Sequence, residues 1–139
     1  MGDRLVRQTG ARVAIVGGPA ERGLAEAIAG AMQAPVRVLA GETSLPELAG
    51  VLAQLRLLVT NDSGPMHVAA ALGTPVVAVF GPTDWRETAP VGQGRIVREP
   101  VECAPCKLRE CPIDHRCMRR VGVEQVAGEA LALLEGRPR

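Results

Sequence analysis

The sequence predicts an α/β fold in which helices flank a parallel β-sheet. Short apolar runs alternate along the chain with longer amphipathic patterns, which is typical of β-α-β units. Aromatic residues make up only 1% of the 139 residues, so Val, Leu, Ile and Ala must build the core. These residues suit parallel strands that helices cover on both faces.

The first half of the chain predicts two strands, each followed by a helix. The expected ranges are a strand at 12–16, a helix at 20–32, a strand at 36–39 and a helix at 44–55. In the first helix, Leu24 and Ile28 fall on one face, which we expect to be buried. Ser44 and Glu47 have the spacing of a capping box, so the second helix should begin there.

The second half predicts a denser alternation. The expected ranges are strands at 57–60, 76–80 and 95–98 and helices at 65–72 and 124–134. Pro65 favours the first position of a helix, and Gly73 favours its end. The region 81–120 is rich in Pro, Gly and Cys and is expected to loop over the sheet, with a Cys-rich loop at 101–120. The length predicts a single domain, 1–139.

The turn between the strand at 57–60 and the next helix is the strongest candidate for ligand binding. It reads Asn61-Asp62-Ser63-Gly64, and Pro65 follows. The free N–H groups and the positive dipole end of that helix would lie at the carboxyl edge of the sheet, where α/β proteins bind phosphate. The alternative is that Asp62 and Ser63 serve only as helix caps.

Two longer motifs surround this turn and carry a family resemblance. They are Asp62-Ser63-Gly64-Pro65-Met66-His67 and, after Ala-Ala-Leu-Gly-Thr-Pro, Phe80-Gly81-Pro82-Thr83-Asp84. Together they resemble glycosyltransferase family 9, the ADP-heptose:lipopolysaccharide heptosyltransferases. The resemblance runs roughly from Val13 to Leu134. It implies a Rossmann-like parallel sheet with flanking helices, the C-terminal, donor-binding half of a two-domain GT-B glycosyltransferase.

The resemblance implies roles for the residues of the first motif. Backbone N–H groups around Ser63, Gly64 and Pro65 would hold the diphosphate of the sugar donor, although Pro65 itself has no N–H to donate. Asp62 would accept hydrogen bonds from sugar hydroxyls. His67 is the candidate catalytic residue, because it could assist the leaving diphosphate; the alternative is that it packs under the loop and fixes its shape.

Three other turns supply further candidates by the same resemblance. Gly18 would let a nucleotide approach the backbone, and Glu21 would accept hydrogen bonds from the ribose; alternatively, Glu21 only favours a helix N-terminus. Thr43 would border the adenine. Thr83 and Asp84 would contact the sugar or its phosphate, and the alternative is a tight Gly-Pro turn.

The chain has four cysteines, all within the Cys-rich loop: Cys103, Cys106, Cys111 and Cys117. The first two have the C-x-x-C spacing of a zinc knuckle, but the second pair lacks it. A structural zinc and free thiols that pack the loop are both open alternatives. Members of the resembled family often show this Cys pattern, but other heptosyltransferases manage without it, so the resemblance implies no cofactor for catalysis.

The function that the resemblance implies is transfer of heptose from ADP-heptose to the lipopolysaccharide inner core. The general base would come from an N-terminal acceptor domain that this chain does not match, so we expect the chain alone to bind donor without turnover. The alternatives are a non-catalytic nucleotide-binding module and another nucleotide-sugar enzyme of the same layout, such as a UDP-sugar 2-epimerase.

Charge and hydropathy limit the kinds of partner and the cellular location that the chain is expected to have. The net charge of +1 argues against a nucleic-acid-binding protein. No stretch is apolar enough to span a bilayer, and the first ten residues contain no signal-peptide core, which predicts a cytoplasmic location. Basic residues cluster late in the chain, between 95 and 120. They predict either a solvated surface or peripheral attraction to the anionic cytoplasmic face of the inner membrane.

Overall fold

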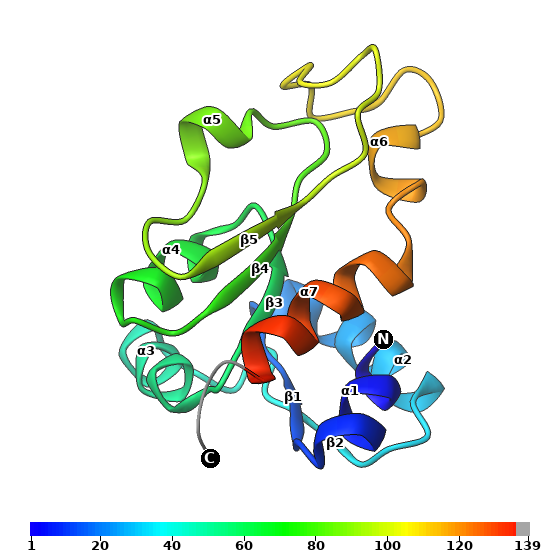
Figure 1. Ribbon diagram of the computed structural model, residues 1–139. Helices are drawn as coiled ribbons and strands as arrows, with labels where there is room; N and C mark the ends of the chain where they lie inside the picture. The colour runs from blue at the N-terminus through cyan, green and yellow to red at the C-terminus, as the bar shows by residue number, and fades with distance from the viewer. Residues whose placement is uncertain (136–139) are drawn as a thin grey trace. The chain divides into compact units, whose positions relative to one another are not determined.

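A computed structural model describes residues 1–135 of the chain (Figure 1). These residues form two compact units, Met1–Val51 and a second unit that begins at Leu52. Each unit contains a parallel sheet with helices packed on it, so the α/β prediction is confirmed. The single domain expected over 1–139 stays a prediction.

The first unit is built on a two-stranded parallel sheet. Val13 of β1 lies opposite Val36 of β2, and Ile15 lies opposite Val38. From β1 onward, the strands and α-helices follow the predicted order. The bounds are α1 (Gly2–Thr9), β1 (Val13–Ile15), the 3-10 turn η1 (Pro19–Glu21), α2 (Arg22–Ala31), β2 (Val36–Val38) and α3 (Leu45–Gln54), which continues into the second unit.

Two features of this unit differ from the sequence prediction. Helix α1 was not predicted; its Asp3 carboxylate accepts hydrogen bonds from the backbone N–H groups of Gln33 (3.0 Å) and Ala34 (2.7 Å), a contact between distant residues. The buried face predicted for α2 is wrong, because Leu24 and Ile28 are 65% and 45% exposed. The helix instead buries Ala25, a small residue that allows close packing on β2.

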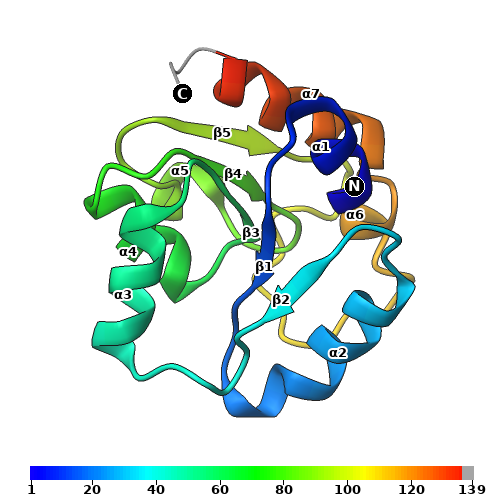
Figure 2. The same ribbon diagram turned by 90° about the horizontal axis from the view of Figure 1, so that it is seen from below.

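The second unit is built on a three-stranded parallel sheet in the order β3-β4-β5 (Figures 1 and 2). Leu58 pairs with Val76, and Val76 pairs with Gly94. Helices α4 and α7 cover opposite faces of this sheet. The bounds are β3 (Leu58–Asn61), α4 (Gly64–Ala71), β4 (Val76–Val79), α5 (Trp85–Thr88), β5 (Gly94–Val97), α6 (Arg116–Arg119) and α7 (Val123–Glu135).

The core of the second unit centres on β4. Val76 and Val77 are fully buried, and so is Met66 on α4. The hydroxyl of buried Thr74 donates a 2.8 Å hydrogen bond to the carbonyl of Leu52, which joins the start of β4 to the end of α3. Because β4 is central and buried, the residues that follow it are held firmly at the carboxyl edge of the sheet.

Two short helices and the Cys-rich loop lie at the carboxyl edge of this sheet (Figure 1). In Figure 1, α5, the Cys-rich loop and α6 lie beyond the carboxyl ends of β4 and β5. Neither short helix was predicted; each spans four residues, too few for a hydrophobic period to show in the sequence. No helix within residues 1–135 combines the length and apolarity that a bilayer crossing requires.

Candidate functional site

The turn between β3 and α4 leaves the start of α4 without a side-chain cap. Ser63 occupies the N-cap position in extended backbone, but its hydroxyl makes no cap hydrogen bond. It lies 3.0 Å from the hydroxyl of Thr60 instead. The alternative that Asp62 or Ser63 serves as a cap is therefore wrong, since Thr60 and Thr88 engage these side chains. An uncapped helix start at the carboxyl edge of a parallel sheet favours an anion.

Asp62 is half-buried and is held from the opposite side of the turn. Its Oδ2 accepts a 2.9 Å hydrogen bond from the hydroxyl of Thr88, at the end of α5. Sequence reasoning missed Thr88, because the two residues are 26 positions apart and Thr88 belongs to no motif. The contact joins the β3–α4 turn to the segment after β4, as expected for two neighbouring parallel strands.

The segment after β4, Gly81–Asp84, is organised by Asp84, which is only 9% exposed. Its carboxylate accepts three hydrogen bonds from Arg86: from the backbone N–H at 3.1 Å and from Nε and Nη2, each at 2.9 Å. The side-chain bond to Arg86 is the main reason that the pKa of Asp84 is lowered. Asp84 therefore caps α5 and fixes Arg86, whose side chain stays 62% exposed.

Basic side chains gather at this edge. Arg86 and Lys107 are exposed, and the guanidinium of Arg98 lies 5.4 Å from the centre of the Trp85 ring. Arg86 was not among the predicted site residues. Arg86 is paired with Asp84 and Lys107 with Glu87, so neighbouring carboxylates offset these two positive charges.

The other predicted residues of the second unit fall around the same turns. Gly64 and Pro65 begin α4, and Thr83 is half-buried beside Asp84. His67 lies on the first turn of α4 and is exposed, which disfavours the alternative that it packs under the loop.

The predicted residues of the first unit gather at the carboxyl edge of its own sheet. Glu21 accepts a 2.7 Å hydrogen bond from the N–H of Gly18. The N–H of Gly41 donates to the carbonyl of Gly17 at 2.9 Å, so the turns after β1 and β2 touch. Thr43 follows in the second of these turns. Their roles toward a nucleotide stay predictions.

The Cys-rich loop gives the zinc prediction no support. Within residues 1–135, no group of three or more His, Cys, Asp or Glu side chains is arranged to hold a metal ion. Cys103, Cys106 and Cys111 are half-buried free thiols. Cys117 is buried, and burial is the main reason that its pKa is raised. The pKa of Cys111 is lowered, chiefly by the N–H of Ile113 and then by that of His115, 3.3 Å from its sulfur.

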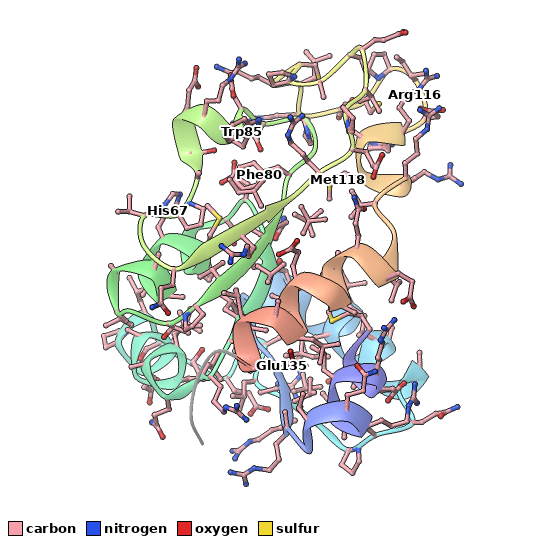
Figure 3. The ribbon with its side chains drawn as sticks, in the orientation of Figure 1. His67, Phe80, Trp85, Arg116, Met118 and Glu135 are labelled. Atoms are coloured by element: carbon pink, nitrogen blue, oxygen red, sulfur yellow. The ribbon has the colours of Figure 1, made fainter. Side chains whose placement is uncertain are left out.

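The loop does brace the turn after β4. The backbone N–H of Lys107 donates to the carbonyl of Pro82 at 2.7 Å, and its Nζ lies 2.7 Å from both carboxylate oxygens of Glu87. Cys117 and Met118 pack directly against Gly81, where a Cβ would overlap the Met118 sulfur and lie 3.3 Å from Cys117 Sγ. Figure 3 shows Met118 at this end of the sheet, with Phe80 and Trp85.

Comparison with known proteins places these features in a family. Residues 3–116 match the family model described as glycosyltransferase family 9 (heptosyltransferase). Over 103 residues the chain is 36% identical to lipooligosaccharide heptosyltransferase 2 of Campylobacter jejuni subsp. jejuni serotype O:2. The aligned region covers 72% of this chain and 32% of that protein. The chain is 48% identical over 67 residues to lipopolysaccharide heptosyltransferase 2 of Escherichia coli K12, covering 48% of this chain and 19% of that protein.

Solved structures of the same family resemble this chain in fold. The ADP-heptose lps heptosyltransferase II of E. coli superimposes with a TM-score of 0.80 at 32% identity, over 96% of this chain and 39% of the other. A family 9 glycosyltransferase of Veillonella parvula gives a TM-score of 0.82 at 27% identity, over 98% of this chain and 40% of the other. The Rossmann-like fold expected from the sequence is thus confirmed. The chain spans about a third of the length of the first of these relatives (32%).

Proposed function

Because the chain belongs to glycosyltransferase family 9, we propose that it binds the nucleotide-sugar donor of a heptosyl transfer. The donor we propose is ADP-heptose, and the acceptor is the lipopolysaccharide inner core at the cytoplasmic face of the inner membrane. The observation that carries the proposal is the uncapped start of α4, which directly follows Asp62 at the carboxyl edge of the sheet. The names of the relatives, lipopolysaccharide and ADP-heptose heptosyltransferases, support this choice of substrates.

Within the second unit, each residue type suits one part of such a donor. The N–H groups at the start of α4, beside Ser63 and Gly64, suit the diphosphate. The carboxylate of Asp62 suits the sugar hydroxyls, because it can accept several hydrogen bonds. Arg86, which Asp84 holds in place, adds a positive charge for the diphosphate. We assign to His67, which is exposed, a hydrogen bond to the leaving group.

Within the first unit, we propose that Gly18, Glu21 and Thr43 contact the nucleoside. The carboxylate of Glu21 already accepts the N–H of Gly18 through Oε2, which leaves Oε1 for a ribose hydroxyl. Transfer also needs a general base that deprotonates the acceptor hydroxyl. We propose that this base lies outside the chain, so the chain contributes donor binding and leaving-group stabilisation to the reaction.

Calorimetric titration of the chain tests this function. We expect saturable binding of ADP, tighter binding of ADP-heptose and much weaker binding of UDP. Glu21→Ala should weaken the binding of both ADP and ADP-heptose. Asp62→Ala should remove only the difference by which ADP-heptose binds more tightly than ADP, because Asp62 is assigned to the sugar. Asp114→Ala is a matched control, since Asp114 pairs with Arg116 on the exposed loop and has no assigned role.

The titration also separates the alternatives. Equal affinity for UDP and ADP would favour another nucleotide-sugar enzyme. ADP binding with no gain from heptose would favour a nucleotide-binding module. Absence of binding to all three ligands would reject donor binding by this chain.

A further inference from the structure

We propose that Thr88 is a positioning residue for Asp62: its hydroxyl sets the orientation of the carboxylate that receives the donor sugar. The inference rests on the proposed function, because it assumes that Asp62 meets sugar hydroxyls. It assigns a role to a residue outside both sequence motifs.

The geometry supports a directed contact. Thr88 Oγ1 lies 2.9 Å from Asp62 Oδ2 and 3.2 Å from the backbone carbonyl of Asp84. A hydroxyl has one proton to donate, and the shorter distance and the negative charge both favour Asp62 as its acceptor. Because Thr88 is half-buried, water competes less for this proton than at an open surface.

The contact decides where the free oxygen of Asp62 points. Within residues 1–135, the Thr88 hydroxyl is the hydrogen-bond partner that the structure gives to the Asp62 side chain. The terminal torsion of Asp is broad, so without a partner the plane of the carboxylate is poorly defined. With Oδ2 bound to Thr88, Oδ1 is left in one direction for a ligand hydroxyl.

Thr88 can serve this role because α5 is itself held in place. A helix of four residues does not persist alone. Here Asp84 caps its first turn, and Lys107 binds Glu87 with both carboxylate oxygens at 2.7 Å from Nζ. The position of Asp62 therefore depends on the segment after β4 and, through Lys107, on the Cys-rich loop.

A set of variants of the full chain tests the proposal with ADP-heptose and ADP as probes. Thr88→Val keeps the shape and removes the hydroxyl; we expect it to weaken ADP-heptose binding about tenfold and to leave ADP binding unchanged. Thr88→Ser should restore binding. In an Asp62→Ala background, Thr88→Val should have no further effect. Thr9→Val is the matched control, because Thr9 makes the same kind of bond to a carbonyl four residues back (Leu5, 2.7 Å) and, within residues 1–135, has no carboxylate partner.

A second measurement does not need a ligand. In the free protein, we expect Thr88→Val to speed amide hydrogen exchange at residues 62–64, and Thr88→Ser to match wild type. If wild type binds neither probe while this exchange effect appears, the proposed function fails and the positioning role stands. Unchanged exchange at 62–64 in Thr88→Val overturns the positioning role. So does a Thr88→Val effect that is equal for ADP and ADP-heptose, or one that persists without Asp62.

Discussion

Asp84 illustrates how one carboxylate organises the edge of the sheet. It is nearly buried, it caps α5 through the N–H of Arg86, and it binds the guanidinium of the same residue through both oxygens. A ligand at this edge would therefore meet the exposed face of Arg86 before it meets Asp84. The predicted contact of Asp84 with the sugar or its phosphate stays a prediction; in the structure, Asp84 supports Arg86.

This arrangement predicts a pH-dependent contribution to stability. The pKa of Asp84 is lowered from its ordinary 3.8, so its bonds to Arg86 are complete above that pH and are lost as pH falls through the lower, folded-state value. Asp84→Asn should therefore unfold at lower urea concentration than wild type at pH 6, and the gap should narrow below about pH 4. Asp114→Asn is the exposed control. A gap that stays constant down to pH 2 would contradict this assignment.

Gly81 is a second residue with a specific structural role, because a Cβ atom at this position would have no room beside Met118. The missing side chain leaves room for Met118, whose Cγ would lie 2.8 Å from a Cβ at this position. We expect Gly81→Ala to destabilise the chain by about 1–3 kcal/mol through overpacking. In a Met118→Ala background the same change should cost clearly less, since the obstructing atoms are gone. Equal costs in both backgrounds, measured by urea unfolding, would show that Met118 does not set the limit.

At the scale of elements, the Cys-rich loop acts as a brace for α5. Its attachment depends on Lys107, which bonds to Pro82 through its backbone and to Glu87 through its side chain. An exposed ion pair contributes about 0–1 kcal/mol, so the effect of losing it should be local rather than global.

We therefore expect Lys107→Met to speed limited proteolysis within 101–120 several-fold while the urea midpoint stays near wild type. Arg95→Met is the matched control, because it removes another exposed ion pair, to Glu129 at 3.4 Å, without touching the loop. If both variants are cut at the wild-type rate, the loop is held by its other contacts.

The elements that the sequence predicted correctly are those whose limits are set by local chemistry. Pro65 and Gly73 delimit α4, and Gly73 has the positive φ (+76°) that favours glycine after a helix. Ser44 and Glu47 also meet as predicted, at 2.8 Å between the Ser44 N–H and the carboxylate. Helix α1, by contrast, is joined through Asp3 to the N–H groups of Gln33 and Ala34, about thirty positions away, a contact that no local pattern reveals.

In the candidate site, too, local contacts were predictable from the sequence and long-range contacts were not. The β3–α4 turn was predictable because strand, polar turn and Pro65 are consecutive. The partner of Asp62 was not, because Thr88 lies 26 positions away and meets Asp62 only once the segment after β4 has folded against the turn. The metal role predicted from the closeness of the cysteines in sequence stays a prediction; within the described residues, no group of three or more potential ligands is arranged to hold a metal ion.

At the scale of the whole molecule, stability should come from an aliphatic core rather than from surface charge. The core residues are chiefly Val, Leu, Ala and Met, with Phe80 as its aromatic member. The ion pairs Arg22–Glu26, Arg95–Glu129 and Lys107–Glu87 all involve side chains that are at least 44% exposed. With a net charge of +1, long-range repulsion is also small.

We therefore expect the free energy of unfolding to change by less than about 1 kcal/mol between about 0.1 M and about 1 M NaCl, although the Debye length falls from about 10 to about 3 Å. Urea unfolding can be followed by fluorescence, because Trp85 is the single Trp and the chain has no Tyr. Sodium sulfate is the control: it should stabilise the chain, because its exclusion from the protein surface strengthens apolar burial. A loss of several kcal/mol in NaCl would mean that the surface ion pairs contribute far more than their exposure implies.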